Sequence, residues 1–329
     1  MKAIKILTMA ALATAVFASC SSEDELAQNN YPMDNVVRIM TSVDGMNTRA
    51  SYGNSTDKLS SFGFCINNAG STKYTYDNIK VTKEGSNWIP ADQMLWQNST
   101  TAVDILAYAP YQETTEDASG KVKVFGKTDY AFSVKEDQSN AEEYSSDLIV
   151  YKQTGFTPGT DLNTSKAVEV LFTHLLSQLN LTIELRDQFN QDEKKPVTEA
   201  TVTDVKVNGT FIRSKVNFAA DPISVRFDGQ VPKAITPETV AFTKADKTTD
   251  HATFKYSAIV IPQWIMAGVF CISFKVNGND YIWTSTSDVN FVSGKKHDLL
   301  LLVGKDVVQG GAISAKPWGE ETITEKETD

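Results

Sequence analysis

The sequence predicts an all-β protein built from antiparallel β-sandwiches, and three observations support this. Apolar and polar residues alternate in many short segments, most regularly in residues 179–186, where every odd position is apolar and every even position is polar. Such a period of two is typical of strands with one buried and one solvated face. Clusters of Asn, Asp, Gly and Ser separate the segments. Helical periodicity is confined to residues 90–95 and 165–176. Many short strands joined by polar turns favour a sandwich.

The expected strands and turns follow one another along the whole chain. Besides residues 179–186, the alternating segments are residues 37–39, 62–66, 103–105, 130–134, 205–207, 269–274 and 274–276. The expected turns are residues 67–70, 117–120, 207–209 and 277–280. No fixed-period repeat interrupts this order.

Length and composition predict two folded domains behind a leader and a tether. Removing residues 1–19 leaves 310 of the 329 residues, which exceeds the size at which a single core keeps growing. We expect a signal peptide at residues 1–19, a flexible tether at residues 20–35, and β-sandwich domains at residues 36–170 and 171–329. The boundary is set within the Gly-, Pro- and Thr-containing residues 153–171.

The first residues have the layout of a signal peptide. Lys2 and Lys5 precede thirteen residues, 6–18, of which only Thr8 and Thr14 are polar. This run is shorter than the roughly 20 apolar residues that a spanning helix needs. We therefore expect the segment to be removed after export.

Cys20 stands where the apolar run ends, directly after Ala18 and Ser19. This arrangement resembles the lipobox of bacterial lipoproteins, although Phe17 occupies a position where Leu, Val or Ile is usual. The resemblance implies that Cys20 becomes an acylated N-terminus, and each buried methylene of an acyl chain contributes about 0.8 kcal/mol to membrane binding. The alternative is an ordinary secretory signal that is cut near the same place.

The net charge and the cysteine content argue against nucleic-acid binding and against a disulfide. Loss of Lys2 and Lys5 changes the formal net charge from -10 to -12, which argues against nucleic-acid binding because phosphates would be repelled. Cys65 and Cys271 remain, both within strand-like segments, so we expect small buried side chains in preference to a disulfide.

No pattern that indicates catalysis or a metal site occurs. His174, His251 and His297 have no partner at ligand spacing, and nucleotide-binding or hydrolase motifs are absent from the sequence. We expect His174 to be a hydrogen-bonded structural residue.

The acid pairs at residues 142–143 and 320–321 are expected on the surface. A carboxylate-based hydrolase needs no local motif and stays a minor alternative. The sequence predicts no enzyme and no cofactor.

The five tryptophans offer a second alternative. Trp88, Trp96, Trp264, Trp283 and Trp318 could stack on sugar rings if they were exposed together, whereas filling the cores is their commoner role. A glycan-binding surface lipoprotein would use such a platform.

Several segments together resemble the fimbrillin family, the type V pilus subunits and fimbrillin-like lipoproteins of Bacteroides-type bacteria. The segment F-T-H-L-L-S-Q-L at residues 172–179 is the most specific. The other matching segments are residues 47–50, 59–64, 88, 95–96, 103–111, 146–149, 294–299 and 316–318. They extend over nearly the whole chain.

The resemblance implies a fold, an assembly route and a location. The fold would be two tandem transthyretin-like β-sandwiches. A trypsin-like protease would cut between Arg49 and Ala50, the strand at residues 36–43 would leave, and a neighbour's extended segment would replace it. The acidic residues 21–25 resemble the signal that sends lipoproteins of this group to the outer face of the outer membrane.

The C-terminal tail departs from what a donor strand needs. Residues 320–329 hold only Ile323 as an apolar anchor among five acids and a lysine, so donation would have to use residues 307–318. The sequence thus predicts a fimbrial subunit or adhesin at the cell surface. Its expected partners are other fimbrial subunits, the membrane through the lipid, a processing protease, and a host or glycan receptor.

Overall fold

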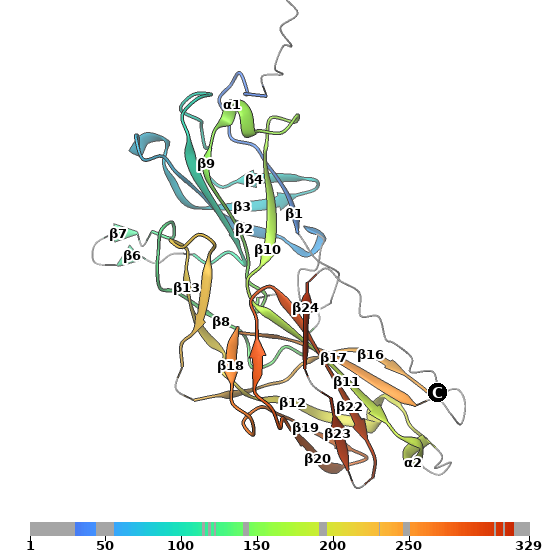
Figure 1. Ribbon diagram of the computed structural model, residues 1–329. Coiled ribbons are helices and arrows are strands. Elements are labelled where there is room, and N and C mark those ends of the chain that lie inside the picture. Colours follow the sequence, from blue (N-terminus) through green and yellow to red (C-terminus); the bar gives the residue numbers. More distant parts are fainter. Residues whose placement is uncertain are drawn as a thin grey trace, which may run out of the picture.

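The computed structural model describes residues 30–43, 56–113, 116–117, 120–121, 123–140, 145–190, 196–229, 231–245, 251–305, 307–311 and 313–318. Strands dominate these residues (Figure 1). The helical elements are single turns: α1 Pro158–Asp161, α2 Asp187–Asn190, η1 Thr56–Lys58, η2 Thr72–Tyr74 and η3 Glu199–Thr201. The predicted all-β class is confirmed.

The two stretches in which the sequence suggested helical periodicity are not helices. Residues 91–95 contain no helix, and residues 165–176 contain strand β10, Val168–His174. In β10 the residues alternate strictly between buried and exposed positions. Leu171 is apolar although it is 47% exposed, which makes the run look continuous in the sequence and hides its period of two.

A seven-stranded sheet forms the N-terminal lobe, at the top of Figure 1. Its strand order is β1-β10-β9-β5-β2-β3-β4. The strands other than β10 are β1 Ile39–Val43, β2 Ser61–Asn67, β3 Tyr76–Glu84, β4 Asn87–Pro90, β5 Val103–Ala109 and β9 Ile149–Phe156. Neighbouring strands are antiparallel except β1 and β10, which are parallel.

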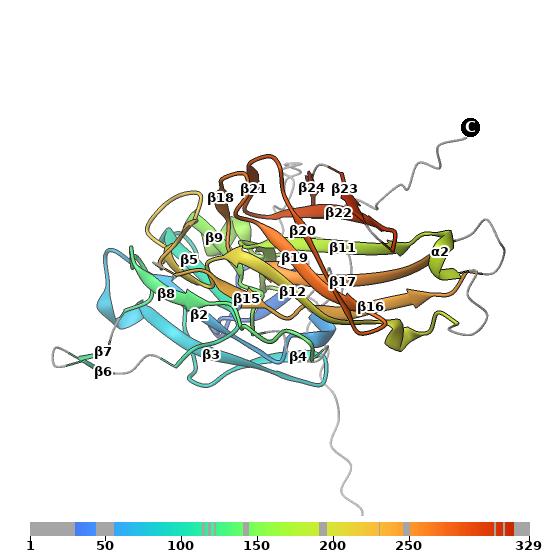
Figure 2. The ribbon, with the colours of Figure 1, turned by 90° about the horizontal axis from the view of Figure 1, so that it is seen from below.

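The C-terminal lobe is a sandwich of two sheets. One has the order β16-β17-β11-β22-β23, with β24 also paired to β22; the other has the order β15-β12-β19-β20. Figure 2 views both layers from below. The bounds are β11 Ser177–Leu185, β12 Val202–Thr210, β15 Lys233–Ile235, β16 Glu238–Thr243, β17 Ala252–Val260, β19 Cys271–Val276, β20 Asn279–Thr284, β22 Lys295–Val303, β23 Val308–Gly310 and β24 Ser314–Pro317.

Smaller sheets complete the fold. They contain β8 Tyr130–Ser133, β13 Arg213–Asn217 and β14 Ser224–Phe227; β18 Gln263–Ile265 and β21 Val289–Phe291; and β6 Glu116–Asp117 and β7 Gly120–Lys121. The pairing of β8 with β13 joins segments from opposite halves of the sequence.

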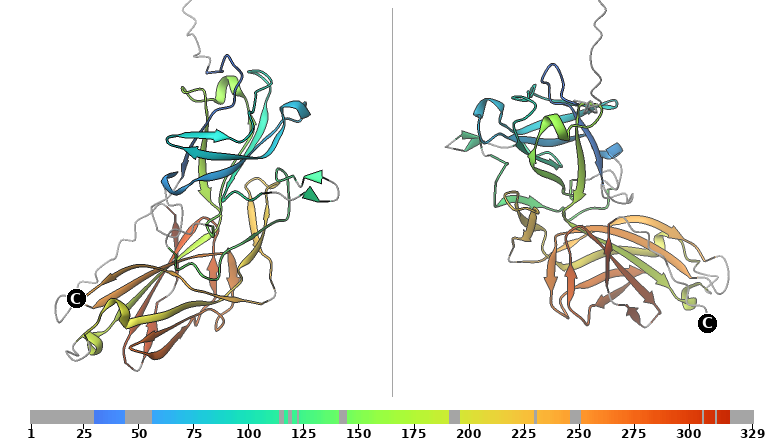
Figure 3. Two further views of the ribbon diagram at one scale, coloured as in Figure 1. Left: turned by 180° about the vertical axis from the view of Figure 1, so that it is seen from behind. Right: turned by 45° about the horizontal axis from the view of Figure 1, so that its top comes forward.

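Polar side chains add to the connection between the lobes, which Figure 3 shows from two further directions. Lys152 of β9 donates through Nζ to the carbonyl oxygens of Phe218, Ala219 and Ala220 at 2.7–3.1 Å. Gln138, which follows β8, binds both the N–H and the C=O of Ile259 in β17. These bonds satisfy backbone groups at a junction where no regular ladder continues.

The buried apolar side chains form two clusters. The smaller one lies on one face of the seven-stranded sheet and includes Phe62, Ile105 and Phe172. The larger one fills the C-terminal sandwich and continues onto the other face of the first sheet, where it includes Leu106 and Tyr108. The domain division at residue 170 stays a prediction, since β10 runs through that position.

Local sequence patterns located the strands more reliably than the turns. In β11, Leu179, Leu181 and Ile183 are buried as the alternation predicted. Asn277 and Gly278 form the predicted tight turn between β19 and β20, both with positive φ. The turn predicted at residues 207–209 is wrong, because Gly209 lies inside β12. A Cβ there would meet the carbonyl oxygen of Val269 at 2.5 Å, so the glycine permits a close strand approach.

Residues 307–318, the expected donor segment, are folded into the protein's own sheet. Both β23 and β24 pair with β22 in antiparallel register. Trp318 is 5% exposed, and its ring stacks on that of His174 with the centroids 3.9 Å apart. His174 is in turn held by Asp147 at 3.0 Å, which confirms its predicted structural role.

Gly310 allows this segment to lie flat against Trp283. A Cβ at Gly310 would come within 2.2 Å of Trp283 Nε1 and 2.9 Å of Leu301, whereas a Cβ at Gly311 would meet nothing within 4 Å. We predict that Gly310→Ala lowers the free energy of unfolding by about 1–3 kcal/mol, because an added methyl overpacks the contact. The control Gly311→Ala changes it by less than about 0.5 kcal/mol. Urea unfolding checks both values, and equal effects would contradict the docked position of the segment.

Candidate functional site at strand β1

Strand β1 lies at one end of the seven-stranded sheet, and among the described strands it pairs with β10 alone. The register runs from Ile39 opposite Val168 to Val43 opposite Phe172. Just before the strand, the Val37 N–H donates to the Met94 carbonyl at 3.0 Å. The approach to β1 is therefore bonded on one side to residues 94–96, while the strand itself is bonded on the other side to β10.

One face of this segment fills the smaller core cluster. Val37, Ile39 and Val43 are 3%, 6% and 5% exposed. Met40 points the other way and is 47% exposed. The alternation predicted for residues 37–39 is thus confirmed, and the segment contributes both backbone pairing and apolar anchors to the lobe.

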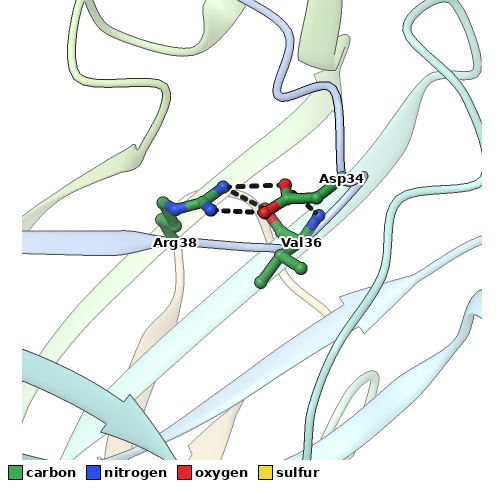
Figure 4. Close-up of polar contacts among 3 residues, drawn as sticks. All are labelled: Asp34, Val36 and Arg38. Atoms are coloured by element: carbon green, nitrogen blue, oxygen red, sulfur yellow. Dashed lines mark hydrogen bonds and ion pairs between the residues drawn. The ribbon is translucent and has the colours of Figure 1, made fainter. Parts of the chain in front are cut away.

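An ion pair orders the chain just ahead of the strand (Figure 4). Arg38 donates to both carboxylate oxygens of Asp34, at 2.6 and 3.1 Å, and Asp34 also accepts the Val36 N–H at 3.1 Å. The hydrogen bonds from Arg38 are the largest cause that lowers the pKa of Asp34 to about 2. Because the pair is exposed to solvent, it fixes the turn more than it stabilises the fold.

The sequence did not single out this ion pair, which lies partly in the expected tether. Its one signal is an acid four residues before a base at the start of an alternating segment. Asn30 also donates to the Leu162 carbonyl at 2.9 Å, and Asn35 accepts the Trp96 N–H at 2.8 Å, so both ends of residues 30–35 contact the N-terminal lobe. The other tether residues, 20–29, lie outside the described residues.

A groove of about 880 Å³ runs along β1 and is bounded on its far side by the β3–β4 hairpin. Its wall includes Trp88, Ile89 and Lys83. Lys83 donates to the Thr56 carbonyl at 2.9 Å and lies 5.8 Å from the centroid of the Trp88 ring. The groove combines apolar surface with a polar rim, a lining that suits an extended chain.

The remaining sequence-predicted site residues are not tested by this geometry. Cys20, Arg49 and Ala50 lie outside the described residues. Cys65 is buried and Cys271 partly buried, and both thiols are free, as expected. No helix in the described part of the chain is long and apolar enough to cross a membrane.

The histidines are separate from one another. His251 lies between Glu184 and Asp187, at 3.1 and 2.8 Å. The His297 ring is buried and accepts the Val292 N–H at Nε2, and burial lowers its pKa. Among the described residues no cluster of His, Cys, Asp and Glu could hold a metal ion.

The tryptophans do not form one exposed platform. Trp96 and Trp318 are buried, Trp88 and Trp283 are partly buried, and Trp264 is 56% exposed. The platform version of the glycan hypothesis therefore lacks its aromatic surface.

Ile39→Ala should weaken the attachment of β1 more than any change on its solvent face. Removing a side chain that is 6% exposed leaves a cavity, and we predict a loss of about 2 kcal/mol or more in unfolding free energy. Met40→Ala on the opposite face is the matched control, with a change below about 0.5 kcal/mol. Chemical denaturation measures both, and similar losses would show that β1 is not anchored by its inner face.

Comparison of this chain with known proteins identifies a family match. The fimbrillin-like family model matches residues 48–318. No sequence in a set of curated proteins matches significantly.

Solved structures share the fold at low sequence identity. Two are described as a "putative cell adhesion protein". The one from Bacteroides uniformis is 20% identical, with a TM-score of 0.56, and the alignment covers 87% of this chain and 99% of that one. The one from Bacteroides ovatus is 12% identical, with a TM-score of 0.61 and coverage of 87% and 98%. A fimbrial protein from Bacteroides vulgatus is 15% identical, with a TM-score of 0.51 and coverage of 86% and 99%. The family match extends over most of the chain and agrees with the shared fold, so this protein belongs to the fimbrillin-like family.

Proposed function

We propose that this protein is a fimbrial subunit or fimbrillin-like adhesin, exported as a lipoprotein and assembled at the cell surface by protease-triggered strand exchange. The observation that carries the proposal is the position of β1. Among the described strands it is an end strand paired with β10 alone, its approach is bonded to residues 94–96, and a few apolar side chains anchor it. Such a strand can leave without dismantling the sheet behind it. Family membership supports a structural and adhesive role without enzymatic activity.

Departure of residues 36–43 would create an acceptor. The edge of β10 from Val168 to Phe172 would lose its partner, and the positions of Val37, Ile39 and Val43 would become empty apolar pockets. An extended segment with alternating apolar residues satisfies both kinds of group at once. We propose a neighbouring fimbrial subunit as the source of that segment.

The C-terminal segment supports accepting a strand more than donating one. Residues 307–318 would have to leave β22 and withdraw Trp318 from His174 before they could enter a neighbour. Undocking exposes a large aromatic side chain, which costs about 3 kcal/mol or more. A subunit that accepts but does not donate would stand at one end of a fimbria.

The rest of the proposal concerns the export route and the domains. Cys20 would carry the lipid that holds the precursor on the outer membrane, and a trypsin-like protease would release the body by cutting after Arg49. The two β-sandwich domains would be transthyretin-like, divided near residue 170. A host or glycan receptor would be the partner of an exposed subunit.

Cleavage after Arg49 tests the assembly step. Treatment of the precursor with an Arg-specific protease is expected to give a new N-terminus at Ala50, followed by oligomers that resist heating on a gel. Arg49→Gln should block both events. Arg38→Gln is the control, because Arg38 lies in the bonded segment at β1 and its loss leaves the Arg49 site intact. A cleanly cut protein that stays monomeric would refute strand exchange.

Lipid attachment is tested separately. In the native type of host, Cys20→Ala should abolish incorporation of labelled palmitate and move the protein from the membrane fraction to the soluble fraction. Cys271→Ala, which removes a different free thiol, should change neither. Palmitate labelling that survives Cys20→Ala would rule out this anchor.

A further inference from the structure

A second cavity lies in the C-terminal lobe, away from β1. It has a volume of about 390 Å³, within the range of small-molecule sites. Its walls come from β20, from the β20–β21 connection and β21, and from the C-terminal segment, where Gly310 and Gly311 contribute backbone. The cavity is too small for an extended strand of several residues but large enough for one sugar ring.

Its lining combines an aromatic ring with neutral polar groups. Trp283 is partly buried, and its ring lies edge to face with Phe270 at 6.3 Å, which limits its movement. Thr286, Ser287 and Asn290 also line the cavity, and within the described part of the chain their side chains donate no hydrogen bonds. A fixed aromatic ring with hydroxyl and amide groups beside it is the chemistry that recognises a sugar, whose ring has an apolar face and a polar edge.

His297 adds a hydrogen-bond donor to the lining of the cavity. Its Nε2 accepts the Val292 N–H at 3.1 Å, so in the neutral ring the proton is on Nδ1. The residue is 1% exposed and lines the cavity, yet Nδ1 has no hydrogen-bond partner among the described residues. A hydroxyl in the cavity would accept this N–H.

The charge of the lining restricts the ligand. The described residues that line the cavity include no Lys or Arg, and the one carboxylate among them, Asp288, already accepts the Ala267 N–H at 2.9 Å. An anionic sugar would enter next to a negative charge and would find no cation to balance its own.

From these observations we propose that this cavity is a binding site for one neutral sugar unit of a glycan, such as a hexose or an N-acetylhexosamine. Trp283 supplies the apolar contact, while Asn290, Thr286 and His297 supply hydrogen bonds. The proposal goes beyond assembly by strand exchange and does not depend on it. Part of the wall is the docked C-terminal segment, so the site exists only while that segment stays in its own sheet.

The test uses the purified, uncleaved protein, so its outcome is independent of strand exchange. The probes are glucose, galactose, mannose, N-acetylglucosamine and N-acetylgalactosamine, with glucuronic acid and N-acetylneuraminic acid as anionic counterparts. Ligand-observed NMR and tryptophan fluorescence titration measure binding. At least one neutral sugar is expected to bind saturably, with a dissociation constant on the order of 1 mM, as befits a single ring. No anionic counterpart should bind more tightly.

Two variants locate the site. Asn290→Ala removes an exposed amide that makes no hydrogen bond within the described chain, so it should weaken binding at least fivefold and leave the melting temperature unchanged. Trp264→Ala removes the exposed tryptophan outside the cavity and should leave binding unchanged. The proposal is overturned if no neutral sugar binds, if Asn290→Ala binds as well as the parent, or if Trp264→Ala abolishes binding.

Discussion

The parallel pairing of β1 with β10 is the constraint on which the N-terminal lobe depends. One short strand closes the end of a seven-stranded sheet and supplies apolar residues to the smaller core cluster. Because β10 would otherwise present unpaired backbone groups and empty pockets, the position must be occupied by some extended segment. Nothing in the pairing itself requires that segment to come from the same chain, and this makes exchange physically reasonable.

The two ends of the chain are attached to different sheets and by different means. Strand β1 has backbone bonds to β10, the residues just before it are bonded to residues 94–96, and an exposed ion pair lies ahead of it. The C-terminal segment is bonded along β22 and fixed by Trp318, which lies against His174 at the junction between the lobes. The close fit of Gly310 to Trp283 adds to this attachment. The N-terminal end is therefore the easier one to release.

The stronger attachment of the C-terminal segment connects the proposed strand exchange at β1 with the proposed sugar site. If the C-terminal segment remains docked, the cavity beneath it persists, and a subunit that has accepted a strand at β1 still carries an intact sugar site. Strand exchange would then change one lobe while the other keeps its shape. Lys152 links β9 to the residues after β13, and Gln138 links the residues after β8 to β17.

Much of the fold could be predicted from the sequence, and the gaps have physical reasons. Alternation reveals a strand when its solvent face is polar, as in β11, but fails in β10, where exposed Leu171 interrupts the pattern. Period two also says nothing about partners, so the parallel register of β1 and the pairing of β8 with β13 could not be derived.

The sequence pattern also does not reveal which residues come together in the candidate sites. The strand at residues 36–43 was expected from a family resemblance, whereas the sugar cavity combines residues 283, 290, 297 and 310, which no local motif brings together. Only tertiary packing places these side chains around one space.

The most direct test of the central claim is complementation of the cut protein by its own strand. The chain beginning at Ala50 is prepared by cleavage, and binding of a fluorescent peptide of residues 30–43 is followed by anisotropy. We predict saturable one-to-one binding that an Ile39→Asp peptide does not show, because Ile39 must enter the apolar cluster. A folded cut protein that binds neither peptide, or that binds both equally, would contradict it.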